Sequence, residues 1–96
     1  MFDAGLSLTM ADAPRALAEG LRALEAGETM FDLARVETLD SAAVALLLAW
    51  QRAARARGAV IEFHRLPPAL CSLAGLYGVT ELLTLISAAQ QNQERH

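Results

Sequence analysis

The sequence predicts an α/β domain in which helices pack against a sheet. Segments with strand character alternate with segments of helical periodicity, in the order strand, helix, strand, helix, strand, helix, helix. Glycines and prolines separate these segments, as expected at element ends. The 96 residues suffice for one domain with a modest core. We therefore expect a single domain over residues 1–96, with a polar tail from about residue 90.

The first strand and helix are predicted from the opening residues. Residues 4–10 alternate loosely and indicate one strand, with three apolar side chains on one face: Leu6, Leu8 and Met10. A helix then begins at Asp12 or Ala13, because Pro14 is tolerated in a first turn, and Gly27 ends it. Its apolar residues recur at helical spacing: Leu17, Leu21 and Leu24.

The remaining elements follow by the same reasoning. In chain order we expect a strand at 29–33, a helix at 42–57, a strand at 59–63, a turn at 64–68, a short helix at 69–77 and a last helix at 81–89. Gly58 and Gly78 end two of the helices, and Thr80 caps the last one.

Composition argues against several classes of partner. The net charge is −3, with eight arginines and no lysine, so the basic surface of a nucleic-acid-binding protein is not expected. The longest apolar run, Ala42–Trp50, has nine residues and is far shorter than the roughly 20 residues that span a bilayer. No signal peptide is evident, and the single cysteine forms no internal disulfide, which leaves the compartment open although a reducing cytoplasm suits it. No direct membrane insertion is expected.

Catalytic and metal-binding patterns are not found in the sequence. The two histidines, His64 and His96, lie in a turn and at the last position, and no Cys/His cluster has the spacing of a metal site. Cys71 falls on an apolar helix and is expected to be a small buried side chain. We therefore expect no enzyme, no metal and no cofactor, and a small hydrolase or transferase is the weakest alternative.

Three polar residues surround the start of the second helix. Asp32 ends a strand, and Asp40 and Ser41 begin a helix eight residues later, so all three could meet at one edge of the sheet. One interpretation is that Ser41 or Asp40 only caps the helix. The other is that the Ser41 hydroxyl faces a protein partner or is phosphorylated.

The second helix also has apolar side chains on nearly every side. We expect one stripe to face the sheet: Val44, Leu47, Leu48 and Ala54. Other apolar residues point elsewhere, namely Leu46, Ala49, Trp50 and Ala53. A helix of this kind is expected to be buried both by its own domain and by a partner, with Trp50 as a binding hot spot. The alternative is that Trp50 wraps over the edge of the core.

At these residues the sequence resembles a known family. The segment Phe31–Leu48 is similar to the signature of STAS domains: a strand ending in Asp-Leu, a loop, Asp-Ser, two small residues and an aliphatic helix. The resemblance covers residues 4–83. The segment Leu73–Val79 is similar to the MlaB branch, whose members are small cytoplasmic subunits of phospholipid ABC transporters.

The resemblance implies a sheet of about four strands with helices mainly on one face, and a subunit that binds the transporter ATPase and lies at the inner membrane through it. It implies that Ser41 is the partner-facing or phosphorylated residue and that Asp32 is a supporting acid. The expected interface comprises Asp40, Ala42, Ala43, Leu46 and Trp50. The alternative function is an anti-sigma-factor antagonist switched by phosphorylation of Ser41. Whether the chain forms a homodimer is left open.

The sequence departs from the family pattern in two places. Many antagonists carry glycine where this chain has Ala43. The chain is also expected to have one strand before its first helix, whereas many STAS domains have two.

Overall fold

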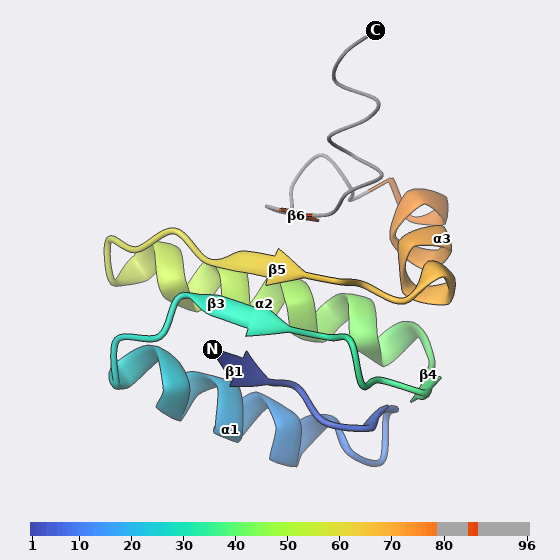
Figure 1. Cartoon of the computed structure of the whole chain (residues 1–96), viewed down its shortest axis with the longest axis horizontal. Coiled ribbons are helices and arrows are strands. Elements are labelled where there is room, and N and C mark those ends of the chain that lie inside the picture. The colour runs from blue at the N-terminus through green and yellow to red at the C-terminus, as the bar shows by residue number, and fades with distance from the viewer. Residues whose placement is uncertain (79–84, 87–96) are drawn as a thin grey trace, which may run out of the picture.

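A four-stranded parallel sheet forms the centre of the computed structural model, which describes residues 1–78 and 85–86. Its strands are β1 (Phe2–Asp3), β3 (Met30–Asp32), β5 (Glu62–His64) and β6 (Leu85–Ile86), adjacent in that order (Figure 1). Because the strands are parallel, their carboxyl ends meet at one edge, and the register aligns Asp3 with Asp32 and Asp32 with His64. The prediction of an α/β sheet of about four strands is confirmed.

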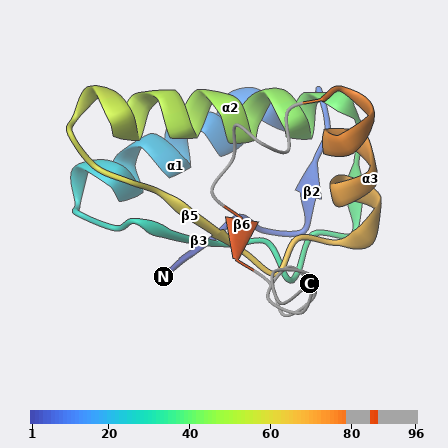
Figure 2. The same cartoon turned by 90° about the horizontal axis from the view of Figure 1, so that it is seen from above.

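A second, two-stranded sheet lies beyond this edge. It pairs β2 (Ser7–Leu8) with β4 (Thr38–Leu39) in parallel (Figures 1 and 2). The prediction of one strand over residues 4–10 is therefore wrong. Gly5, with φ of +93°, turns the chain between β1 and β2, and Leu8 is buried whereas Met10 is exposed. Two strands thus precede the first helix, and the expected departure from the STAS pattern is not present.

Three helices complete the described fold: α1 (Ala13–Glu25), α2 (Ser41–Ala56) and α3 (Pro68–Leu76). A glycine with positive φ follows each of them: Gly27, Gly58 and Gly78. Figure 2 shows α1 and α2 on the same face of the main sheet, with α3 at one end of this layer. These bounds lie within about two residues of those predicted, and the placement of the helices mainly on one face is confirmed.

The core lies between the sheet and the two long helices. Phe31 and Phe63 point from adjacent strands toward α2, with their ring centroids 6.2 Å apart. The Trp50 ring of α2 packs edge-on against Phe31 at 5.2 Å and against Phe2 at 5.9 Å. β1, β3 and β5 therefore each contribute a phenylalanine to one aromatic cluster, and the Trp50 ring packs against two of the three.

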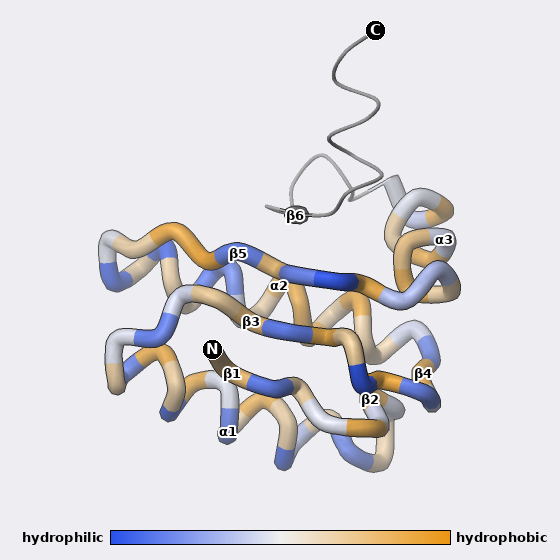
Figure 3. The backbone as a smooth tube through the Cα atoms, in the orientation of Figure 1, coloured by the Kyte–Doolittle hydropathy of each residue, from blue (hydrophilic) through white to orange (hydrophobic). Residues whose placement is uncertain are grey.

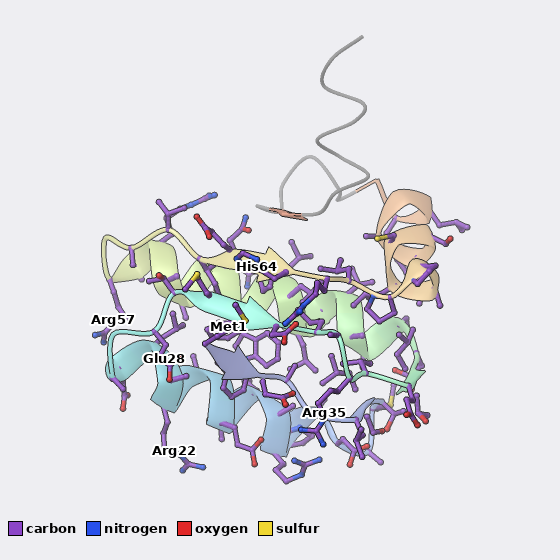
Figure 4. The ribbon with its side chains drawn as sticks, in the orientation of Figure 1. Met1, Arg22, Glu28, Arg35, Arg57 and His64 are labelled. Atoms are coloured by element: carbon purple, nitrogen blue, oxygen red, sulfur yellow. The ribbon has the colours of Figure 1, made fainter. Side chains whose placement is uncertain are left out.

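Charged residues alternate with these phenylalanines, and Figure 3 shows the hydrophilic stretches on β3 and β5. Asp3 pairs with Arg35 at 2.6 Å, Asp32 pairs with Arg65 at 2.6 Å, and His64 lies 3.1 Å from Glu62. The amino terminus of Met1 pairs with Glu28 at 3.0 Å (Figure 4). The charged and polar side chains that alternate with the core residues therefore form a row of contacts, two of which are Asp–Arg ion pairs.

The predicted last helix at 81–89 is not supported where the structure describes it. Leu85 and Ile86 form β6, which pairs with Phe63 and His64 of β5. The run of aliphatic residues suits a buried strand as well as a helix, so periodicity alone could not separate the two. The other residues of this predicted helix, and Thr80 as its cap, lie outside the described residues.

Candidate functional site

The candidate site is built around the N-terminus of α2, where Asp40 joins two parts of the chain. Asp40 directly follows β4 and has an extended backbone conformation, with φ of −141° and ψ of −165°. One carboxylate oxygen, Oδ1, accepts the backbone N–H of Ala42 at 2.8 Å, and the other, Oδ2, accepts that of Met10 at 3.0 Å. Asp40 is therefore the helix cap, and it also holds the loop after β2 against the start of α2.

Ser41 is the first residue of α2, and its side chain is exposed. Its hydroxyl makes no hydrogen bond to any other residue in the described ranges. The capping interpretation therefore applies to Asp40 and not to Ser41. The hydroxyl instead lies at the N-terminal end of the helix, where the helix dipole creates a partial positive charge.

Two apolar grooves run on either side of α2 close to Ser41. The first, here the α1–α2 groove, has a volume of about 490 Å³ and is lined by Met10, Ala13, Pro14, Leu17, Ala42, Ala45, Leu46 and Ala49. The second, the α2–α3 groove, has a volume of about 360 Å³ and is lined by Ser41, Val44, Ala45, Leu48 and Tyr77. Ala45 belongs to both grooves, so they form one continuous apolar surface beside the hydroxyl.

Two of the expected interface residues do line this surface. Ala42 and Leu46 both face the α1–α2 groove, although Leu46 is only 4% exposed. Ala42 is half-buried and stands beside Ser41. The inference of a second apolar face on α2 therefore has a structural basis, but that face is made by small side chains and by neighbours on α1.

Trp50 and Ala43 are corrections to the expected interface. Both are 0% exposed in the core. The indole of Trp50 lies against Gly20 of α1, and its Nε1–H donates to the carbonyl oxygen of Leu17 at 3.3 Å. Trp50 therefore has no exposed surface of its own to offer a partner, because its indole packs between α1, α2 and the sheet.

Asp32 does not join Asp40 and Ser41 through any hydrogen bond in the described part of the chain. Its carboxylate receives two bonds from the Arg65 guanidinium and one, at 3.1 Å, from the backbone N–H of Ala34. These bonds lie at the edge of the main sheet, whereas Asp40 directly follows β4 of the β2–β4 sheet. The predicted constellation of three polar residues is therefore divided into two.

The remaining titratable groups show no catalytic arrangement within residues 1–78 and 85–86. The Arg65 hydrogen bonds lower the pKa of Asp32, and hydrogen bonds from Ser7, Thr9 and Arg15 lower the pKa of Asp12, so both acids are ionised at neutral pH. In these ranges no three His, Cys, Asp or Glu side chains form a group that could hold a metal ion.

Cys71 is exposed on α3, and the expectation that it is buried is wrong. Partial burial of the thiol nevertheless raises its pKa, so it is not activated as a nucleophile.

Sequence reasoning did not identify Met10 and Tyr77 as site residues. Met10 is 72% exposed and lines the α1–α2 groove, and Tyr77 is 55% exposed and lines the α2–α3 groove. Met10 lies 31 residues before Ser41 and Tyr77 lies 36 residues after it, so their proximity to Ser41 is not evident from the sequence. The sequence signal for Tyr77 is its place in the segment Leu73–Val79, which is similar to the MlaB branch.

Comparisons with known proteins agree with this architecture. The family model described as "Mlab, STAS domain" matches residues 5–86. The structure of the anti-sigma factor antagonist SpoIIAA in its unphosphorylated form is similar, with a TM-score of 0.60 and 17% sequence identity over 99% of this chain and 83% of that one. This second similarity shows a shared fold. No curated protein matches the chain.

The longest described helix, α2, has 16 residues, fewer than the roughly 20 that span a bilayer. None of the described helices is both long and apolar enough to cross a bilayer.

Proposed function

The chain belongs to the STAS domain family, of the MlaB type, and on this basis we propose that it is a non-enzymatic subunit that binds and regulates the ATPase of a lipid-transport ABC system. In this proposal the protein is cytoplasmic and is held at the inner membrane through its partner. It acts by binding and needs no metal or cofactor.

The observation that carries the proposal is that the Ser41 hydroxyl lies between two apolar grooves and makes no hydrogen bond to the other described residues. An exposed apolar surface with a polar group at its centre is typical of a protein interface. The grooves can receive apolar side chains of the ATPase, while the Ser41 hydroxyl donates a hydrogen bond to an acceptor on it. The positive end of the α2 dipole strengthens the attraction for such an acceptor.

Complex formation with the ATPase tests this proposal directly. The chain would be co-expressed with the Mla-type ATPase of the same genome, and the affinity of the purified proteins measured by calorimetry. We expect a stoichiometric complex and an ATPase rate that differs between free and bound enzyme. Separate elution of the two proteins at micromolar concentration, with no heat of binding, would contradict it.

A second candidate function is favoured by the fold shared with SpoIIAA and by the accessibility of Ser41. In this alternative, phosphorylation of Ser41 switches an anti-sigma-factor antagonist. A phosphate on Ser41 would be stabilised by the helix dipole but would stand beside the Asp40 carboxylate. Incubation with an anti-sigma-factor kinase and ATP, followed by mass spectrometry, decides it: a phosphate on Ser41 supports the switch, and unmodified Ser41 opposes it.

A further inference from the structure

Arg65 has an unusual backbone conformation. Its φ is +56°, and it is the one residue other than glycine with positive φ among the residues that the structure describes. This left-handed region is unfavourable for a side chain with a Cβ atom, so something must hold Arg65 there. The guanidinium supplies that restraint: Nε donates to Asp32 Oδ1 at 3.1 Å and NH2 donates to Oδ2 at 2.6 Å. The two parallel bonds fix direction as well as distance.

The ion pair joins two neighbouring strand ends. Asp32 is the last residue of β3, and Arg65 directly follows β5. The backbone N–H of Leu33 also donates to the carbonyl oxygen of His64 at 2.9 Å, so backbone and side-chain bonds act at the same point. The Asp32 side chain therefore contacts the chain at the point where it leaves β5.

The direction in which the chain leaves β5 determines where α3 starts. Only Leu66 and Pro67 separate Arg65 from α3, and Pro67 has a restricted φ of −61°. Leu70 and Ala74 of α3 are fully buried, and Tyr77 follows as the C-cap residue that lines the α2–α3 groove beside Ser41. A short helix moves as a rigid body, so a change at its first residues is transmitted to Tyr77.

We propose that Asp32 and Arg65 are positioning residues for the docking surface, which is the apolar surface formed by Ser41 and the two grooves beside it. Their ion pair sets the placement of α3 and thereby of Tyr77 beside Ser41. The effect on partner binding rests on the proposed function, whereas the effect on α3 does not. Asp32 thus serves the site without lying in it, through Arg65 and α3.

Two measurements on Arg65→Asn test this inference. Asparagine tolerates positive φ but cannot form the bidentate pair, so the substitution removes the restraint without adding backbone strain. A nitroxide on Cys71, the single and exposed cysteine, reports where α3 lies through broadening of the amide signals of residues 41–48. The second measurement is affinity for the ATPase. Two variants are controls. Arg65→Lys keeps the positive charge but cannot form the two parallel hydrogen bonds to Asp32. Arg35→Asn removes the ion pair with Asp3, which does not involve the segment that leads to α3.

We expect Arg65→Asn to change the broadening pattern and to weaken ATPase binding by about fivefold or more. Arg65→Lys should give an intermediate effect on the pattern, and Arg35→Asn should leave it unchanged. An unchanged pattern in folded Arg65→Asn overturns the inference whether or not the ATPase binds. A changed pattern with unchanged affinity overturns the role in docking. If the wild type does not bind the ATPase, the proposed function fails while the positioning of α3 is still decided by the nitroxide.

Discussion

At the scale of single residues, Trp50 shows how an apolar helix can mislead. Four residues of α2 are fully buried and follow helical spacing at i, i+4, i+7 and i+11: Ala43, Leu47, Trp50 and Ala54. The predicted sheet-facing stripe shares Leu47 and Ala54 with these four residues, but it contained Val44 and Leu48 in place of Ala43 and Trp50. What the sequence did not reveal is that Gly20 of α1 leaves space for the indole.

Gly20 provides the test of this packing. A Cβ atom at this position would stand 2.1 Å from Nε1 of Trp50. We therefore expect Gly20→Ala to lower the free energy of unfolding by about 1–3 kcal/mol through overpacking, although alanine is the better helix former by about 1 kcal/mol. Urea denaturation measures the change. Ala18→Met, on the exposed side of α1, is the control and should alter stability by less than about 0.5 kcal/mol. A stabilised Gly20→Ala protein would contradict the described contact.

At the scale of elements, Asp40 and Ser41 have separate roles at the start of α2. Asp40 accepts two backbone N–H groups, whereas the Ser41 hydroxyl has no bond to the other described residues. We expect Asp40→Ala to lower the free energy of unfolding by about 1 kcal/mol or more, because both N–H groups lose their acceptor. Ser41→Ala, the matched neighbour, should change it by less than about 0.5 kcal/mol. Thermal unfolding of the two variants measures the difference. A larger loss of stability from Ser41→Ala than from Asp40→Ala would show that Ser41, and not Asp40, is the helix cap.

The long helices could be predicted, and the short strands could not. α1 and α2 have apolar periodicity over several turns and a glycine after the last turn. β2 and β4 have two residues each, too few for a periodic pattern, and they pair across thirty residues of sequence. Their pairing is what brings Met10 to Asp40, so this part of the site could not be predicted from local patterns.

At the scale of the whole molecule, the parallel sheet separates two kinds of surface. The phenylalanines of β1, β3 and β5 face α1 and α2, while the alternating charged residues form ion pairs. The apolar surface that we propose for docking lies elsewhere, where α2 begins and α3 ends. The residue pattern placed Ser41 correctly at the start of α2. The neighbours of Ser41 come from distant segments and required the structure.

The ion pairs predict how stability depends on pH. The pKa of Asp3 is lowered by hydrogen bonds from Gly5 and Arg35, and those of Asp12 and Asp32 are lowered by Ser7 and Arg65 respectively, all from an ordinary value of 3.8. A pKa lower in the folded state means that the stabilisation is fully present above the ordinary value and is lost as pH falls through the lowered values. We expect the free energy of unfolding to decrease on acidification below about pH 4.

Urea denaturation between pH 6 and pH 2.5 measures this dependence. Asp32→Asn is the control, because it removes one of the three contributions and should flatten the profile. Equal stability of the wild type across this range would show that these ion pairs do not favour the folded state.

The affinity of Ser41→Glu for the ATPase tests the central claim most directly. The dipole at the start of α2 tolerates the added charge, so the melting temperature should stay within about 4 °C of the wild type. At the interface the same charge must be desolvated beside Asp40, so binding should weaken about tenfold or more. Ala56→Glu adds the same side chain at the far end of α2, about 22 Å away, and should bind like the wild type. Equal affinities of wild type and Ser41→Glu by calorimetry would contradict the account and remove Ser41 from the docking surface.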